Sequence, residues 1–155
     1  MQCLEEDIDI DIIGTPPEDT NIQSEVIGTH RLIFLAYPNH RLCQLDRELT
    51  PKELIKHQLI AREVGSDTRL AMAAYFGALF HQATRPPIVL DTNEGIKQSI
   101  LAGMGISLLS DATCELELKH GLLKRPCRSK ALRSIVSGTL FDWPTLNAIQ
   151  LSKDF

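Results

Sequence analysis

The chain has 155 residues, enough for one domain with an adequate hydrophobic core. Its composition, 43% hydrophobic and 23% charged, is that of an ordinary globular protein and excludes wholesale disorder. The net charge of −4, with no stripe of lysine and arginine, disfavours DNA binding by this chain alone, because phosphate contacts need clustered cations.

The four cysteines stand far apart and form no Cys-x-x-Cys pair, so they lack a zinc or redox spacing. We expect free, mostly structural thiols in a reducing compartment. No run approaches the ~20 apolar residues that a membrane-spanning helix needs. The acidic, alternating N-terminus resembles neither a secretory signal nor a transit peptide. These features predict a cytoplasmic protein without membrane contact (or a protein of the plastid stroma, if it is plastid-encoded), or a piece of one.

The first expected element is a strand over residues 7–13, where isoleucine alternates with aspartate. The wholly apolar run at 32–37 predicts a central strand in a covered sheet. Residues 50–53, Thr-Pro-Lys-Glu, form a capping box with proline at the first helical position, which predicts the start of a short helix.

Strands and helices then alternate along the chain. The expected order is strand 58–61, helix 67–81, strand 87–90, helix 93–102, strand 105–109, helix 111–119 and a short strand near 122–124. Such alternation predicts an α/β domain with a mixed, largely parallel sheet. Beyond it, we expect residues 132–136 to form a strand beside 7–13, and residues 144–155 to form a terminal helix.

Polar residues follow three of the expected strands, at the points where helices begin. In the first turn Gly65 precedes Ser66 and Asp67, either of which can cap the next helix. The second turn contains Asn93 and Glu94, and Ser110 can cap the helix after the third. Exposed N–H groups and the positive end of a helix dipole suit an anion or a polar ligand. Three such turns favour a small-molecule cleft over a catalytic centre.

Motifs of enzyme chemistry are absent from the sequence. The five histidines show no metal-ligand spacing, and there is no Gly-x-Ser-x-Gly elbow and no Walker loop. Residues 103–105, Gly-Met-Gly, follow a helix and precede a strand, which is the wrong order for a dinucleotide loop. We therefore expect no catalytic residue, no metal site and no cofactor.

Four segments resemble the effector-binding domain of LysR-type transcriptional regulators, in that family's order. REVGSDTR at 62–69 and NEGIKQSILAGMGISLLS at 93–110 carry the resemblance. DIDIDIIGTPPED at 7–19 resembles the family's hinge strand, and HRLIFLAYPNHRL at 30–42 resembles its Pro-Asp-His-Pro-Leu segment. The branch that regulates Calvin-cycle (RuBisCO) operons is the most similar. Asp67 stands where the family usually has glycine, which alters the charge of the presumed ligand turn.

The resemblance implies a periplasmic-binding-protein-like (type 2) α/β fold with two lobes, the first of them N-terminally truncated here. Residues 1–24 would be the hinge strand and a remnant of lobe one, residues 25–124 a complete lobe two, and residues 125–155 the return strand and terminal helix of lobe one. DNA would be contacted only through a missing N-terminal domain. We also expect a homo-oligomer, because unpaired strand edges invite another chain.

The implied function is sensing of a small metabolite, a sugar phosphate or a nicotinamide nucleotide, which shifts the balance between open and closed arrangements. The implied effector-binding residues are Thr15, Pro16, Glu63, Gly65, Ser66, Asp67, Thr68, Arg69, Asn93 and Glu94. Taken as isolated residues, Glu63 and Arg69 fit a surface ion pair across the helix start, and Asn93 and Glu94 fit simple helix caps. A stand-alone solute-binding protein, an enzyme of the same two-lobe fold and a non-functional regulator remnant remain as alternatives.

Overall fold

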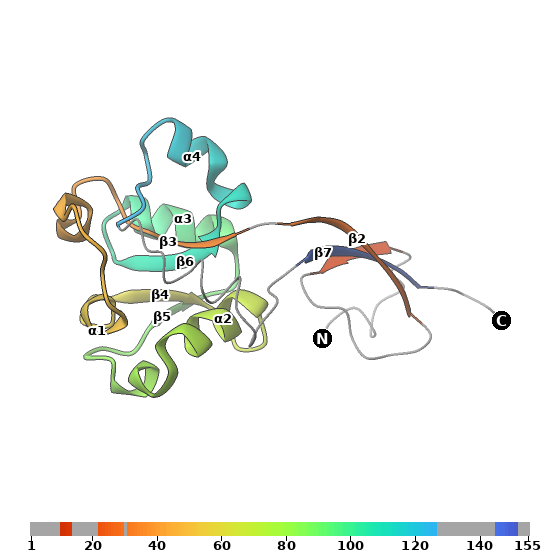
Figure 1. Cartoon of the computed structure of the whole chain (residues 1–155), viewed down its shortest axis with the longest axis horizontal. Helices are drawn as coiled ribbons and strands as arrows, with labels where there is room; N and C mark the ends of the chain where they lie inside the picture. Colours follow the sequence, from red (N-terminus) through yellow and green to blue (C-terminus); the bar gives the residue numbers. More distant parts are fainter. Residues whose placement is uncertain (1–9, 14–21, 30, 127–144, 152–155) are drawn as a thin grey trace. The chain divides into compact units, whose positions relative to one another are not determined.

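The computed structural model describes residues 10–13, 22–29, 31–126 and 145–151, with side chains described within 31–126. The chain separates into two compact units, which meet in the sequence near residue 30 and again near residue 141. The smaller unit contains strands β1, β2 and β7, and the larger unit contains every other labelled element (Figure 1).

The smaller unit is a three-stranded antiparallel sheet. Its strands are β1 (Ile10–Ile13), β2 (Ile22–Thr29) and β7 (Thr145–Leu151), in the order β1-β7-β2. The central strand β7 is antiparallel to both neighbours, and a bulge shifts the register of β2 between Val26 and Gly28.

One expectation for this unit was wrong. Residues 145–151 form a strand, not part of a terminal helix, and this strand pairs with β1. The three-residue spacing of Leu146 and Ile149 fits a helix locally, but hydrogen bonding on both sides to strands far away in the sequence decides the conformation. Strand β2 was not expected at all, and residues 7–9 and 132–136 lie outside the described residues.

The larger unit is built on a four-stranded mixed sheet. Its strands are β3 (Leu32–Leu35), β4 (Leu59–Arg62), β5 (Ile88–Leu90) and β6 (Ile106–Ser110), in the order β3-β6-β4-β5. Strand β4 is parallel to β5 and to β6, while β3 is antiparallel to β6. The predicted mixed, largely parallel sheet is therefore confirmed. The short strand expected near 122–124 is reduced to a single bridge between Lys124 and Ala36.

Four short α-helices connect these strands. They are α1 (Pro51–Leu54), α2 (Asp67–Phe76), α3 (Asn93–Leu101) and α4 (Glu115–Lys119), with 3-10 turns η1 (Arg41–Gln44), η2 (Gly77–Gln82) and η3 (Ala112–Cys114). The capping box is confirmed, because a Glu53 carboxylate oxygen accepts from Thr50 N at 2.9 Å. Helix α2 is shorter than the expected 67–81. It ends at Gly77, whose φ of 53° is a conformation that residues with a Cβ rarely adopt.

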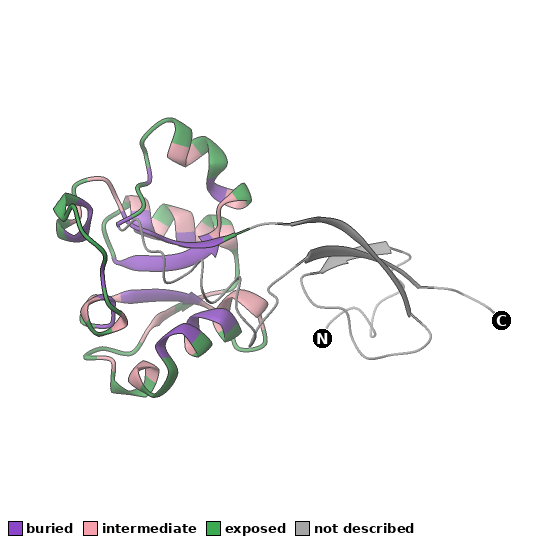
Figure 2. Cartoon of the chain, viewed as in Figure 1, coloured by how far each residue is buried: buried purple, intermediate pink, exposed green. Residues whose placement is uncertain are grey.

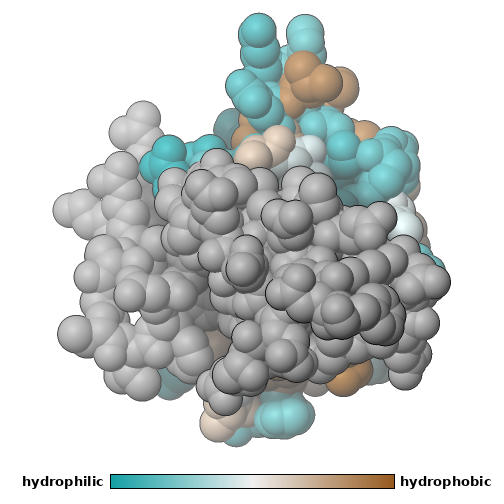
Figure 3. Space-filling view, turned by 90° about the vertical axis from the view of Figure 1, so that its right-hand side faces the viewer, coloured by the Kyte–Doolittle hydropathy of each residue, from teal (hydrophilic) through white to brown (hydrophobic). Residues whose placement is uncertain are grey.

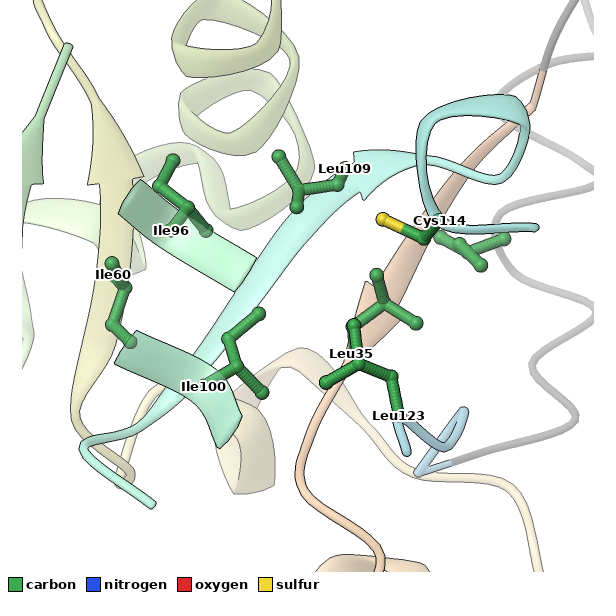
Figure 4. Close-up of a cluster of buried hydrophobic side chains, with 8 residues drawn as sticks. Leu35, Ile60, Ile96, Ile100, Leu109, Cys114 and Leu123 are labelled. Atoms are coloured by element: carbon green, nitrogen blue, oxygen red, sulfur yellow. The ribbon is translucent and has the colours of Figure 1, made fainter. Parts of the chain in front are cut away.

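Helices cover both faces of the sheet, because successive strand residues point to opposite sides. Ile33 and Leu35 of β3 face α3, where they join a buried cluster with Ile96 and Ile100 (Figure 4). The intervening Phe34 faces α2, and its ring lies 5.0 Å from the ring of Tyr75 and 5.7 Å from that of Phe76. The buried residues of the larger unit accordingly line the strands and the inner helix faces (Figure 2).

The outer surface is mixed in polarity. Leu116 of α4 is 68% exposed, and hydrophobic side chains lie among hydrophilic ones at that end of the molecule (Figure 3). Among the described residues, no helix has the length and apolarity required to cross a membrane.

Candidate functional site

The carboxyl ends of the parallel strands β4, β5 and β6 meet at one edge of the larger unit's sheet. The turn after β4 leads to α2 on one face, and the turn after β5 leads to α3 on the other (Figure 1). Open α/β sheets bind their ligands outside such an edge, where successive connections leave to opposite faces. The three polar turns expected from the sequence therefore lie at the edge where a ligand site belongs. We call it the carboxyl edge.

The first turn presents the start of α2. Gly65 has φ 99°, which a residue with a Cβ rarely adopts, and it turns the chain from the strand into the helix. Of the two predicted candidates, Ser66 and not Asp67 is the N-cap, and its hydroxyl accepts from Arg69 N at 3.2 Å. The positive end of the helix dipole lies at this turn, and the first amides of a helix point outward along its axis. Asp67, the first helical residue, adds a negative charge at this point.

Arg62, the last residue of β4, joins the first turn to the second. Its Nε and Nη2 donate to the Glu63 carboxylate at 2.7 and 2.8 Å, and its Nη1 donates to Asn93 Oδ1 at 2.9 Å. The side chain is only 20% exposed. Arg62 was not among the residues expected in the site, although it opens the REVGSDTR segment. Its position at the end of a buried strand, beside a carboxylate, was the signal available.

The expected ion pair between Glu63 and Arg69 was wrong. Glu63 pairs with Arg62 instead, and the hydrogen bonds from that guanidinium lower the pKa of Glu63. The guanidinium of Arg69 lies 4.9 Å from the centre of the Phe80 ring, which η2 brings back toward α2. Within the part of the chain that the structure describes, its buried Nη1 has no hydrogen-bond partner.

In the second turn the cap is Thr92, which was not singled out from the sequence. Its hydroxyl accepts from Gly95 N at 3.0 Å. The alternative that Asn93 and Glu94 are caps is therefore wrong. Asn93 bonds Arg62, and Glu94 contacts residues in the next turn of α3. Glu94 accepts from Gln98 Nε2 at 2.8 Å and pairs with Lys97 Nζ at 2.8 Å.

Lys97 also reaches Glu117 of α4, at 2.7 Å. The two side chains are 13% and 17% exposed, so this ion pair is largely shielded from water. Hydrogen bonding to Glu117 and Glu94 raises the pKa of Lys97, and the bond from Lys97 lowers the pKa of Glu117. The contact ties α3 to α4 and is structural.

In the third turn Ser110 does not act as a cap. The N-cap of η3 is Asp111, and its carboxylate accepts from Arg31 N at 3.0 Å rather than from the helix. Asp111 N in turn donates to Arg31 O at 2.8 Å. These two bonds fix the point at which the chain enters β3, so the third turn anchors that strand and offers no cap hydroxyl.

At the start of α2 the carboxyl edge presents amides and hydroxyls, while the guanidinium of Arg62 is already engaged. All three guanidinium nitrogens of Arg62 already donate to Glu63 and Asn93. Thr68, half-buried in the first turn of α2, has a hydroxyl placed beside the helix start. Thr15 and Pro16, the other expected effector residues, lie outside the described residues, so their part in the site stays a prediction.

The residues with described side chains contain no group of three or more potential metal ligands. The two cysteines among them, Cys43 and Cys114, are buried free thiols. Burial raises the pKa of both, and that of Cys114 to about 11, so neither is an activated nucleophile.

Comparison with known proteins gives consistent matches. The family described as the LysR substrate binding domain matches residues 2–137. The HTH-type transcriptional regulator CfxR of Cupriavidus necator is 40% identical over 115 residues, which cover 74% of this chain and 35% of CfxR. The HTH-type transcriptional regulator CbbR of Sinorhizobium medicae is 34% identical over 117 residues, which cover 76% of this chain and 37% of CbbR. The chain therefore spans about a third of the length of these curated relatives.

A solved structure matches nearly the whole chain. The regulatory domain of CcmR from Synechocystis PCC6803, in complex with 2-PG, superposes with a TM-score of 0.71 and 26% sequence identity. The superposition covers 99% of this chain and 69% of that domain.

Proposed function

Since the chain belongs to the family of LysR substrate-binding domains, we propose that it senses a small-molecule effector on behalf of a transcriptional regulator. The relatives named above are transcriptional regulators and not enzymes. In this proposal the larger unit corresponds to lobe two and the smaller unit to part of lobe one. Contact with DNA would require a helix-turn-helix segment in addition to these residues, and the regulator would work as an oligomer in the cytoplasm.

The proposed effector is a small anionic metabolite held at the carboxyl edge. Sugar phosphates and nicotinamide nucleotides are the expected classes. The ligand 2-PG of the Synechocystis regulatory domain is the first compound to test. The observation that carries this proposal is the open first turn of α2, where amide N–H groups and the helix dipole favour negative charge.

The residues of the first turn would have different roles in ligand binding. The Ser66 hydroxyl is already used by the Arg69 amide, so its role is to hold the turn in shape. Gly65 lets a ligand approach the backbone, since nothing lies within 4 Å of the place a Cβ would occupy. The Thr68 amide and hydroxyl are then the direct donors. Glu63 and Glu94 are neutralised in part by Arg62 and Lys97, which limits their repulsion of an anion. Thr15 and Pro16 stay in the proposed set.

The regulatory step follows from the link between the two turns. A ligand that changes the conformation of the first turn also shifts Arg62, which begins this turn. Because Arg62 is bonded to Asn93, the shift reaches the start of α3. Only a ligand that binds one arrangement of the domain better than another can shift their balance. We therefore propose that effector binding is coupled to the position of α3 relative to β4.

Isothermal titration calorimetry of the 155-residue chain with 2-PG tests the proposal, with a sugar phosphate and a nicotinamide nucleotide as parallel titrants. The expected result is saturable binding of one of the three. Binding weaker than about 1 mM for all three, corresponding to roughly 4 kcal/mol, would contradict the proposed effector classes.

A further inference from the structure

A hollow lies at the other end of β4, away from the carboxyl edge. Its volume is about 350 Å³, within the range of small-ligand sites. It is lined by residues that precede strands β4 and β5 or belong to η1: Arg41, Lys56, His57, Gln58, Thr84 and Arg85. Because β4 and β5 are parallel, their amino ends meet here. We call this hollow the amino-end pocket.

The lining of the amino-end pocket is cationic. Arg41, Lys56 and Arg85 contribute three positive charges, and no carboxylate lines the pocket. Across the part of the chain whose side chains are described, none of these three cations forms an ion pair. Arg31, Arg47, Arg62 and Lys97 form ion pairs, whereas Lys52, Lys119 and Lys124 form none with the described side chains. The amino-end pocket is distinguished because three unpaired cations surround one hollow that no described carboxylate lines.

The histidine in the pocket is held in its neutral form. Arg41 Nη2 lies 3.3 Å from His57 Nε2, and because a guanidinium only donates, Nε2 must accept and carry no proton. Burial, the charge of Arg41 and the neighbouring His40 lower the pKa of His57 to about 4. The His40 ring lies 4.8 Å from the His57 ring and is fixed by the bond from Leu42 N to its Nδ1.

Three hydrogen bonds of Gln58 hold the floor of the pocket. Gln58 Nε2 donates to Leu59 O at 3.1 Å and to Pro86 O at 2.9 Å, which ties the start of β4 to the segment before β5. The backbone carbonyl of Gln58 accepts from Ile106 N at 2.9 Å. Three strands therefore hold the pocket in place, while its cations remain exposed to solvent.

We propose that the amino-end pocket binds the phosphate group of a small anion, as a second ligand site separate from the carboxyl edge. A phosphate would remove the mutual repulsion of Arg41, Lys56 and Arg85 and accept charge-assisted hydrogen bonds from them. The hydroxyl of Thr84 supplies a further donor. A concave hollow of this size fits one phosphate group, whereas a DNA backbone needs an extended basic surface. The four residues of β4 separate the two sites by about 13 Å.

The charged and titratable groups around His57 are Arg41 and His40, with Lys56 and Arg85 lining the same hollow. A bound phosphate offsets the positive charge of Arg41, which disfavours the protonated form of His57, so the imidazole signals of His57 report directly on binding.

Inorganic phosphate is the probe, and the imidazole and amide NMR signals of His57, Gln58 and Thr84 are the readout. The test variant is Lys56→Gln with Arg85→Gln, since both side chains are exposed and neither forms an ion pair or a side-chain hydrogen bond with another described residue. The control, Lys52→Gln with Lys119→Gln, removes the same charge from exposed positions elsewhere in the larger unit. We expect saturable shifts at His57, about tenfold or more weaker binding in the test variant and unchanged binding in the control.

Three results would overturn the proposal. They are the absence of saturable shifts at His57, equal weakening in the test variant and the control, and a response of these signals to duplex DNA but not to phosphate. Thr68→Ala separates this site from the carboxyl edge, because it leaves phosphate binding at His57 unchanged.

Discussion

Arg62 Nη1 donates to Asn93 Oδ1 over 2.9 Å, so that the end of β4 and the start of α3 are joined by one side-chain bond. The remaining nitrogens of the same guanidinium hold Glu63. Two of the three polar turns at the carboxyl edge are thus one connected unit, although 31 residues separate them in the sequence.

Lysine should not be able to replace the hydrogen bonds that the planar guanidinium of Arg62 makes. Arg62→Lys keeps the charge but cannot bond Glu63 at two points and Asn93 at a third. We expect a loss of about 1–2 kcal/mol in the free energy of unfolding, after allowance for the partial exposure of Glu63. Urea denaturation measures it. Arg47→Lys, which alters an exposed pair with Glu53, is the matched control and should cost less. Equal losses would show that the link to Asn93 adds nothing.

The Lys97–Glu117 pair should contribute to the decrease in the free energy of unfolding at acidic pH. The pKa of Glu117 is below its ordinary value of 4.5 in the folded state. Its contribution is therefore complete above that value and is lost as the pH falls through the folded-state pKa. Glu117→Gln removes this contribution, so the free energy of unfolding should fall less between pH 6 and pH 3 than in the unchanged chain. Glu115→Gln, on the exposed side of α4, should leave the slope as it is. The same slope in both variants would argue against the pair.

Gly105 should tolerate no side chain, for a steric reason. A Cβ at this position would collide with the backbone carbonyl of Gln58, the oxygen that accepts from Ile106 N. Gly105→Ala should cost about 1–3 kcal/mol, because backbone must move in a packed sheet. The exposed neighbour variant Met104→Ala should change stability by less than about 0.5 kcal/mol. Thermal unfolding compares them, and similar midpoints would mean that the start of β4 can shift freely.

Thr68→Ala should weaken effector binding without unfolding the domain. The loss of one hydrogen bond to a charged group corresponds to about 1.5–3 kcal/mol. Calorimetric titration with the effector identified among the three titrants measures the change. His120→Ala, an exposed position at the end of α4 that lines neither proposed site, is the control and should bind the effector normally. Equal weakening in Thr68→Ala and His120→Ala would contradict a direct role for Thr68.

Local sequence signals predicted the larger unit well where the decisive contacts are themselves local. The capping box at 50–53 and the Ser66 cap each involve atoms three residues apart, and both are present. The apolar strands and their order also followed from alternation. Asn93, the partner of Arg62, is 31 residues away along the chain, and the strand that pairs with β1 is more than 130 residues away. A local sequence pattern does not specify contacts over such separations.

The same distinction explains the errors at the candidate site. Glu63 and Arg69 have a spacing that permits an ion pair, but Arg62 is adjacent to Glu63 and Phe80 lies under Arg69. Residues 145–151 contain a helix-like spacing, but two long-range strand pairings outweigh it. Sequence alone identified the turns that form the carboxyl edge, and it did not identify which of their side chains contact one another.

The most direct test of the account is a map of amide shifts in the ¹⁵N NMR spectrum of the chain during titration with 2-PG. If the carboxyl edge is the effector site, the largest shifts fall on residues 64–69, and smaller ones reach residues 92–95 through the Arg62–Asn93 bond. In the Arg62→Lys variant the shifts at 64–69 remain and those at 92–95 disappear. Saturable binding of 2-PG that leaves residues 64–69 unperturbed would contradict the proposed site.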